Sequence, residues 1–232
     1  MTVEDTSKQT SSGPSRSVRY RPLTEADNDA IMVLMRGEWF DDPEYRTDQN
    51  RTLAATIDMR LLFKMTTGGI IVEDDQANEV VGVITWHGPQ LPTTRDQGLQ
   101  EVAVAKALEA GDALDAESSR DLRQFDADMR RYQEVSRQHR MPDGIDPFDG
   151  SITLLLLKKG YHGLGIGRKL LEDAQAACKD AGSTRLYLDT DNELNYHFYE
   201  RMGWTQYATW PYELTIFGKH YETTGMIYAK DL

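Results

Sequence analysis

The sequence predicts a single α/β domain that carries a helical insertion. Three observations lead to this prediction. Strand and helix patterns alternate along most of the chain. Apolar residues make up 39% of the 232 residues, which is enough for one continuous core. A strongly charged, helix-favouring stretch from about Pro92 to Gly150 interrupts the alternation, and we expect two inserted helices there, with a break at Gly111.

The expected domain covers residues 18–232 and follows an N-terminal tail. Residues 1–17 are rich in Ser, Thr and charge, which predicts a disordered segment. A strand over "VRYRPL" is then followed by a helix that Thr24 caps. The segment "LAATIDMRLLFKM" predicts a second amphipathic helix, and "GIIVEDDQANEVVGVITWHG" predicts two strands joined by a polar turn.

The second half follows the insertion. "SITLLLLKKGY" predicts a buried strand, and "IGRKLLEDAQAACKDAG" predicts a helix that ends at Gly182. "TRLYLDT" predicts the next strand, and "ELNYHFYERMGW" a short helix. The segments "WTQYATWPYELTIFG" and "YETTGMIYAKDL" predict two final strands.

Composition excludes several classes of partner. A net charge of −12 opposes binding to nucleic acid or to an anionic membrane surface. The one cysteine, Cys178, cannot form an internal disulfide, and no leader pattern precedes the domain, so we expect a cytoplasmic protein. We expect no metal, because no His or Cys cluster has metal-ligand spacing.

The stretch "YHGLGIGRKLL", residues 161–171, places a glycine-rich turn between the buried strand and a helix. Such a turn suits a phosphate group, because free backbone N–H groups and the positive helix end face it together. Gly163, Gly165 and Gly167 do not form the dinucleotide fingerprint, and no Gly-Lys-Ser/Thr completes a Walker loop. A merely tight strand-to-helix connection is the alternative interpretation.

A second motif, "LYLDTDNELNYHFYERMGW", lies downstream. With both motifs in order, the chain resembles the GNAT superfamily of N-acetyltransferases from about Ser151 to Trp204. That family has Gln/Arg-x-x-Gly-x-Gly/Ala after its fourth strand, then an Asn and a Phe/Leu-Tyr-Glu-x-x-Gly-Phe helix end. The motif spacing is most similar to the branch that contains puromycin acetyltransferase. One departure is His162, which stands where Gln or Arg is usual.

The resemblance implies the GNAT fold, a central mixed, mostly antiparallel sheet flanked by helices, here with a helical insertion before the fourth strand. It implies transfer of the acetyl group of acetyl-CoA to a primary amine of a small molecule or peptide, by direct attack in a ternary complex. The implied acetyl-CoA-binding residues, of which the three leucines act through their backbone, are Leu155, Leu156, Leu157, His162, Gly163, Leu164, Gly165, Ile166, Gly167, Arg168, Asn195 and Tyr199.

Two of these residues are the implied catalytic residues. Tyr199 would be the general acid to the sulfur, with core packing as its alternative, and Asn195 would bond the pantetheine arm or nearby backbone. Asn192 could take the place of Asn195 or cap the helix. The general base stays unassigned among Asp149, Glu73, Asp189 and a water chain. If backbone contacts dominate, we expect His162→Ala to weaken acetyl-CoA binding only modestly.

Several other residues and the insertion each have two possible interpretations. Trp39, Trp86 with His87, and Trp210 either line an acceptor pocket or, more in keeping with their positions, form the edge of the core. Cys178 is expected to be a buried small hydrophobe. The insertion is either a pair of solvated helices or a lid. For the whole chain, the alternatives are an acyl-CoA-binding module without turnover and a protein that binds another nucleotide. A homodimer stays open.

Overall fold

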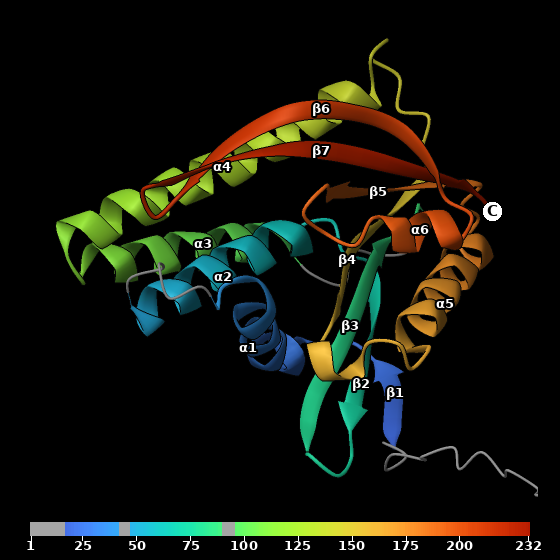
Figure 1. Ribbon diagram of the computed structural model, residues 1–232, viewed down its shortest axis with the longest axis horizontal. Coiled ribbons are helices and arrows are strands. Elements are labelled where there is room, and N and C mark those ends of the chain that lie inside the picture. The colour runs from blue at the N-terminus through green and yellow to red at the C-terminus, as the bar shows by residue number, and fades with distance from the viewer. Residues whose placement is uncertain (1–16, 42–46, 90–95) are drawn as a thin grey trace, which may run out of the picture.

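The computed structural model describes residues 17–41, 47–89 and 96–232, so the predicted tail lies outside the described residues except for Ser17. A seven-stranded sheet with the order β1-β2-β3-β4-β5-β7-β6 forms the centre of the fold (Figure 1). Neighbouring strands are antiparallel except for β4 and β5, which are parallel. The prediction of a mixed, mostly antiparallel sheet flanked by helices is confirmed.

The elements follow the predicted order. The strands are β1 (Val18–Pro22), β2 (Gly68–Asp74), β3 (Glu79–His87), β4 (Gly150–Leu157), β5 (Arg185–Asp191), β6 (Thr205–Ile216) and β7 (Lys219–Asp231). The helices are α1 (Asn28–Trp39), α2 (Asp48–Phe63), α3 (Gln97–Asp112), α4 (Ala116–Arg140), α5 (Ile166–Asp180) and α6 (His197–Arg201). Single 3₁₀ turns, η1 (Glu25–Asp27) and η2 (Lys159–Tyr161), precede α1 and follow β4.

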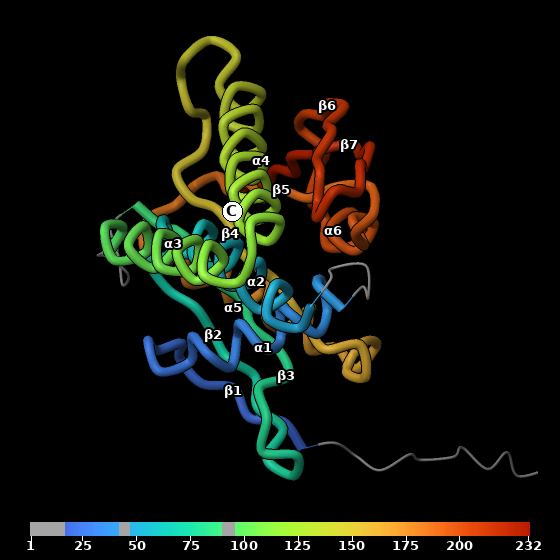
Figure 2. Tube along the Cα trace, turned by 90° about the vertical axis from the view of Figure 1, so that its left-hand side faces the viewer, coloured from blue at the N-terminus to red at the C-terminus, as the bar shows by residue number. Residues whose placement is uncertain are grey.

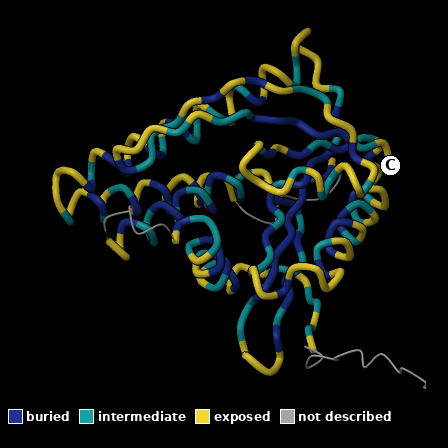
Figure 3. The backbone as a smooth tube through the Cα atoms, viewed as in Figure 1, coloured by how far each residue is buried: buried dark blue, intermediate teal, exposed yellow. Residues whose placement is uncertain are grey.

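Helices cover both faces of the central strands (Figure 1). Helix α5 covers one face through Leu170, Leu171 and Cys178, which pack in one cluster with residues of β3, β4 and β5. Helices α1 to α4 cover the other face, where Ile57 and Phe63 pack with Leu154 and Leu156 of β4. Figure 3 shows the resulting buried band along the central strands.

The insertion forms two helices, but the interpretation of solvated helices is wrong. One side of each helix is buried in the core, through Val104 of α3 and through Leu122 and Phe125 of α4. Gly111 does not break the first helix: it lies within α3, where a Cβ atom would come 2.4 Å from Leu122 Cδ1, so the two helices can approach closely. The chain turns after Asp112, and Asp115 caps α4.

Helix α4 also carries the long β6–β7 hairpin, which runs beside it (Figures 1 and 2). The Tyr212 hydroxyl donates to the Asp128 carbonyl oxygen at 2.5 Å, and the Thr215 N–H donates to the Asp128 carboxylate at 2.9 Å. At the hairpin turn, Phe217 is buried in the same hydrophobic cluster as residues of helices α1 to α4. The insertion therefore fixes the position of the hairpin relative to the sheet.

Candidate active site

Strands β4 and β5 separate partway along their length. They pair only from Gly150 to Ile152 on β4 and from Leu186 to Leu188 on β5. Beyond these pairs, β4 stays bonded to β3 as far as Leu157, and β5 stays bonded to β7 as far as Asp191. The two strands thus diverge and leave a wedge between them.

Among the described residues, part of the backbone of β4 faces this wedge and pairs with no neighbouring strand. The Lys158 N–H donates to the Val81 carbonyl on β3, and residues in an antiparallel ladder alternate between facing the partner strand and facing away from it. Leu155 and Leu157 therefore direct their N–H and C=O groups toward the wedge. Leu156 pairs with Val83 and directs its backbone groups to β3, so the implied role of Leu156 in binding acetyl-CoA through its backbone is corrected.

The glycine-rich turn lies at the end of β4, where it opens α5. Gly163 and Gly165 have φ angles of 78° and 79°, a left-handed conformation that glycine adopts without strain. A Cβ atom on either glycine would meet nothing within 4 Å, so the turn faces open space. Gly165 is the N-cap residue of α5, so the positive end of the helix faces the same space.

The amide groups of the turn are free to bind an anion. In the described part of the chain, the N–H groups of residues 163–168 donate to no protein acceptor, and the first bond of α5 runs from Lys169 N–H to Gly165 O. The Leu164 and Arg168 side chains are exposed, whereas Ile166 is buried and can contribute only its amide. This geometry fits a pyrophosphate group.

His162 makes a contact that the sequence does not reveal. Its Nε2 atom lies 2.8 Å from the carbonyl oxygen of Leu157, one of the two residues whose backbone groups face the wedge. Because a carbonyl oxygen can only accept, Nε2 carries the proton. The imidazole therefore bonds the end of β4 across the base of the glycine-rich turn.

Tyr199 lies on α6 beside this turn. A Cβ atom on Gly167 would lie 3.8 Å from Phe198 Cζ, so α6 packs against the first turn of α5. The half-buried Tyr199 ring contacts Trp204 and Tyr228, with ring centroids 6.5 and 6.2 Å away. Burial raises the pKa of Tyr199 to about 12, so its hydroxyl is protonated at neutral pH and available as a donor.

The two asparagines before α6 have different surroundings. Asn195 is exposed, and its carbonyl oxygen accepts from the Phe198 N–H at 3.0 Å. The side-chain oxygen of Asn192 accepts from the Thr223 hydroxyl and the Thr224 N–H, at 2.8 and 2.7 Å. Asn192 therefore ties the loop to β7, and the N-cap residue of α6 is Tyr196 rather than Asn192.

Two of the three candidate bases hold parts of the fold together. The Asp149 carboxylate accepts from the Thr184 N–H and hydroxyl and from the Arg185 N–H, so it holds the turn that leads into β5. Glu73 forms ion pairs with Arg19 and Arg21. Both carboxylates are therefore engaged in contacts that build the fold.

The third candidate, Asp189, lies on β5 just past its last pair with β4. Its Oδ1 accepts from the Ser136 hydroxyl of α4 at 2.5 Å. Solvent reaches Asp189, yet the protein around it removes hydration and raises its pKa, an effect that the Ser136 hydrogen bond partly opposes. Since α4 and α5 lie on opposite faces of the sheet, Asp189 approaches the wedge from the side away from the glycine-rich turn.

One further carboxyl group, that of Asp58, has an unusual environment that the sequence did not predict. Asp58 lies on α2 between the buried residues Ile57 and Met59, is itself half-buried, and has no hydrogen bond or ion pair to another described residue. Burial raises its pKa from 3.8 to about 7. The available signal was a single acid in the apolar run "LAATIDMRLLF".

The core interpretation holds for Trp86 and Trp210, which are buried, and Trp39 packs against the core beside α2. Cys178 is fully buried, and burial raises its pKa to about 12, as expected for a small hydrophobe. Across residues 17–41, 47–89 and 96–232, no group of three or more His, Cys, Asp and Glu side chains could hold a metal ion. None of the helices in these ranges has the length and apolar composition needed to cross a membrane.

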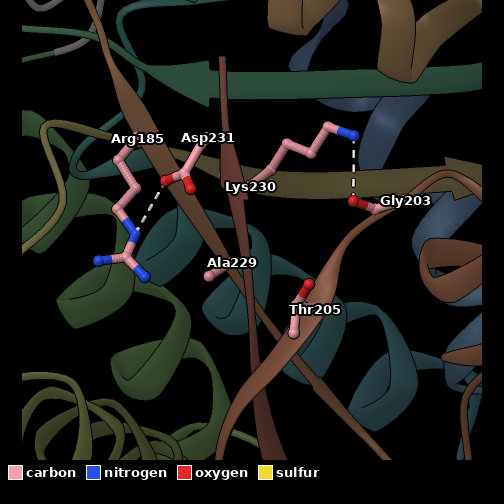
Figure 4. A pocket seen from close by; sticks show the side chains of 6 residues that line it. All are labelled: Arg185, Gly203, Thr205, Ala229, Lys230 and Asp231. Carbon is pink, nitrogen blue, oxygen red and sulfur yellow. Dashed lines mark hydrogen bonds and ion pairs between the residues drawn. The ribbon is translucent and has the colours of Figure 1, made fainter.

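A cavity of about 380 Å³ lies away from the wedge, beside Arg185, the first residue of β5 (Figure 4). Its two cationic side chains are already engaged. Arg185 pairs with Asp231 at 3.2 Å, and the Lys230 ammonium donates to the carbonyl oxygens of Met202 and Gly203. The contacts of these side chains stabilise the end of the sheet.

Comparisons with known proteins agree with this site. A family model described as the acetyltransferase (GNAT) family matches residues 128–204, which include β4, the glycine-rich turn and α6. The chain is 38% identical over 60 residues to N-alpha-acetyltransferase 30 of Schizosaccharomyces pombe. That match covers 25% of this chain and 40% of the yeast protein, so the chain spans less than half of that relative.

Solved structures match over nearly the whole chain. Arylalkylamine N-acetyltransferase 2 from Aedes aegypti has a TM-score of 0.56 at 15% identity, with 93% of this chain and 99% of that chain covered. A mosquito arylalkylamine N-acetyltransferase like 5b has a TM-score of 0.51 at 11% identity, with 93% and 100% covered. At these identities the likeness establishes the fold.

Proposed function

Because this chain carries an acetyltransferase domain of the GNAT family, we propose that it transfers the acetyl group of acetyl-CoA to a primary amine. One observation carries the proposal: the unpaired N–H groups of residues 163–168 lie next to the open edge of β4. The N–H groups suit a pyrophosphate, and the edge of β4 suits a ligand that contains amide groups. Coenzyme A contains both, joined in one molecule.

Each part of acetyl-CoA has candidate partners. The N–H groups from Gly163 to Arg168 would hold the pyrophosphate, since no side chain obstructs them at the glycines. The backbone groups of Leu155 and Leu157 would pair with the pantetheine arm as an added strand would. Asn195, exposed before α6, would bond the pantetheine amide or backbone near it.

The chemistry needs a neutral amine and a proton for the leaving sulfur. Acetyl-CoA supplies an activated acetyl thioester. The amine nitrogen attacks the acetyl carbonyl carbon, the carbon–sulfur bond breaks, and the sulfur leaves as the thiol of coenzyme A. Tyr199 donates the proton to the sulfur, because its hydroxyl lies on the helix that packs against the glycine-rich turn and is protonated at neutral pH.

Asp189 is the best candidate for the group that accepts the proton from the amine. It is the only one of Asp149, Glu73 and Asp189 that lies next to the wedge, and its raised pKa favours proton uptake. The amine would approach from the side of α4, opposite the turn that binds the phosphates. Helix α4 then belongs to the acceptor side of the site, through Ser136.

The acceptor is proposed as a primary amine of a small molecule. The fold is similar to that of two arylalkylamine N-acetyltransferases, proteins whose names state an amine acceptor. A peptide N-terminus is the second candidate, favoured by the local identity to an N-alpha-acetyltransferase. A cytoplasmic location and a homodimer remain expectations from the sequence.

A direct assay tests the proposal. Acetyl-CoA is incubated with the protein and a panel of arylalkylamines, polyamines and short peptides, and the release of thiol is followed. We expect release that depends on both the protein and one class of amine. Tight binding of coenzyme A without release for any amine would favour an acyl-CoA-binding module. Thermal stabilisation by NAD or ATP but not by coenzyme A would favour another nucleotide.

A further inference from the structure

The hydrogen bond from His162 to Leu157 lies where the pantetheine arm is expected to bind. Of the two β4 residues that face the wedge, Leu157 is the nearer to the glycine-rich turn, and its carbonyl oxygen accepts from His162 Nε2 at 2.8 Å. The imidazole side chain is exposed, so solvent surrounds the rest of the ring. A small rotation about its side-chain bonds would release the carbonyl.

We propose that His162 is a latch that must leave the Leu157 carbonyl before the pantetheine arm can bind there. This inference rests on the proposed function, because it takes coenzyme A as the ligand. Pantetheine contains two secondary amides whose N–H groups need acceptors when they leave water. The imidazole already donates to one of these acceptors, the Leu157 carbonyl oxygen, which faces the wedge.

The latch predicts the opposite sign from the sequence-based expectation for His162. The hydrogen bond stabilises the ligand-free state, so its loss removes a competitor of the ligand. A single intramolecular hydrogen bond corresponds to a factor of about 2 to 10 in an equilibrium constant. Replacing His162 should therefore tighten coenzyme A binding by about 2- to 10-fold, whereas the sequence-based expectation is a modest loss.

Two other roles for His162 predict different results. If the imidazole bound the pyrophosphate, its removal would weaken every ligand that carries the phosphates. If it only braced the glycine-rich turn, its removal would weaken the same ligands equally. If His162 is a latch, its removal changes the affinity only for a ligand that has a pantetheine arm. A ligand without the arm keeps its affinity, since the proposed phosphate contacts come from backbone N–H groups.

Isothermal titration calorimetry distinguishes these roles without turnover. The ligands are coenzyme A and 3′-phosphoadenosine 5′-diphosphate, which keeps the pyrophosphate and lacks the pantetheine arm. The variants are His162→Ala, His162→Phe, which keeps a ring but has no donor, and His220→Ala as a control at an exposed histidine of β7. We expect both His162 variants to bind coenzyme A about 2- to 10-fold tighter and to bind 3′-phosphoadenosine 5′-diphosphate with unchanged affinity, with His220→Ala like the wild type.

Unchanged or weaker binding of coenzyme A by both folded His162 variants would overturn the latch while leaving the proposed function in place. Failure of the wild-type protein to bind coenzyme A would instead overturn the proposed function, and the latch with it. Thermal denaturation of each variant, compared with the wild type, establishes that it is folded before titration.

Discussion

Ser136 of α4 donates a hydrogen bond of 2.5 Å to Asp189 of β5, which connects the insertion to the strand that borders the wedge. Ser136 is buried, and Asp189 lies just past the last residue of β5 that pairs with β4. The insertion therefore reaches the site through a side chain, in addition to covering the core. Deleting the insertion would remove Leu122 and Phe125 from the core, so point variants are the suitable test.

The first prediction concerns the pH dependence that Ser136 confers. Its hydrogen bond lowers the pKa of Asp189 against the effect of burial, so Ser136→Ala should raise that pKa further. If Asp189 must be ionised to accept a proton, the acidic limb of kcat/KM for the amine should move to higher pH, by about one unit. Acetyl-CoA affinity should not change.

Ser119→Ala is the matched control. The Ser119 hydroxyl donates an equivalent hydrogen bond of 2.5 Å to Asp112, and this pair does not involve β5. Its pH profile should coincide with that of the wild type. An identical limb in the Ser136→Ala variant, measured with chemistry rate-limiting, would remove Asp189 from the reaction.

The sequence allowed the prediction of the elements and of the glycine-rich turn, because both depend on local patterns. The glycines and the helix that follows them lie within one short segment, and so does the leucine-rich strand. The contact between Ser136 and Asp189 joins residues 53 apart, and no local pattern encodes it. The burial of Leu122 and Phe125 was hidden because charged residues surround both of them in the sequence.

The hydrogen bond from His162 to Leu157 could not be predicted for a different reason. His162 and Leu157 are only five residues apart, but their contact depends on how η2 folds the intervening chain back. A family motif compares residue types at a position and does not report which atom a substituted side chain reaches. The same limit applies to Leu156, whose backbone direction depends on the register with β3.

The second prediction concerns Gly165. Gly165→Val should abolish coenzyme A binding, because a side chain would enter the open space in front of the turn and the φ of 79° disfavours any residue with a Cβ atom. Gly144→Val is the matched control: Gly144 has a φ of 75° and equally open surroundings, but it lies in the loop before β4.

Both variants should lose similar stability in thermal denaturation, about 1 kcal/mol or more, and only Gly165→Val should lose binding in calorimetry. Normal coenzyme A affinity in a folded Gly165→Val protein would contradict the placement of the pyrophosphate.

The third prediction concerns Asp58 and stability. Its pKa rises from 3.8 in the unfolded chain to about 7 in the folded protein, so the folded state favours the neutral carboxyl. The stability associated with this group is full below pH 3.8 and is lost as the pH rises toward 7. Asp58→Asn, which is neutral at every pH, should raise the free energy of unfolding at pH 8 by about 1–3 kcal/mol.

The gain from Asp58→Asn should shrink as the pH falls to 5.5. Urea unfolding at both values measures it, with Asp180→Asn at the exposed end of α5 as a control whose effect should be the same at both pH values. A gain that does not depend on pH would mean that Asp58 is ionised in the folded protein at pH 5.5 as well.

The last prediction concerns the hydroxyl of Tyr199. Tyr199→Phe keeps the ring that packs against Trp204 and Tyr228 and removes the proton donor. If the hydroxyl acts on the leaving sulfur, turnover should fall by about 10²- to 10³-fold with little change in acetyl-CoA affinity. Tyr207→Phe, at a tyrosine whose hydroxyl contacts the Arg140 carbonyl, is the control and should keep wild-type turnover.

The pH profile gives an independent reading of the same residue. Burial raises the pKa of Tyr199 to about 12, so the phenol stays protonated through the usual assay range and should cause no loss of activity below about pH 10. A role in packing alone predicts near-normal rates for Tyr199→Phe and lost stability for Tyr199→Ala. Wild-type turnover in Tyr199→Phe at saturating substrates, with chemistry rate-limiting, would therefore assign the ring to the core and leave the sulfur to be protonated by another group.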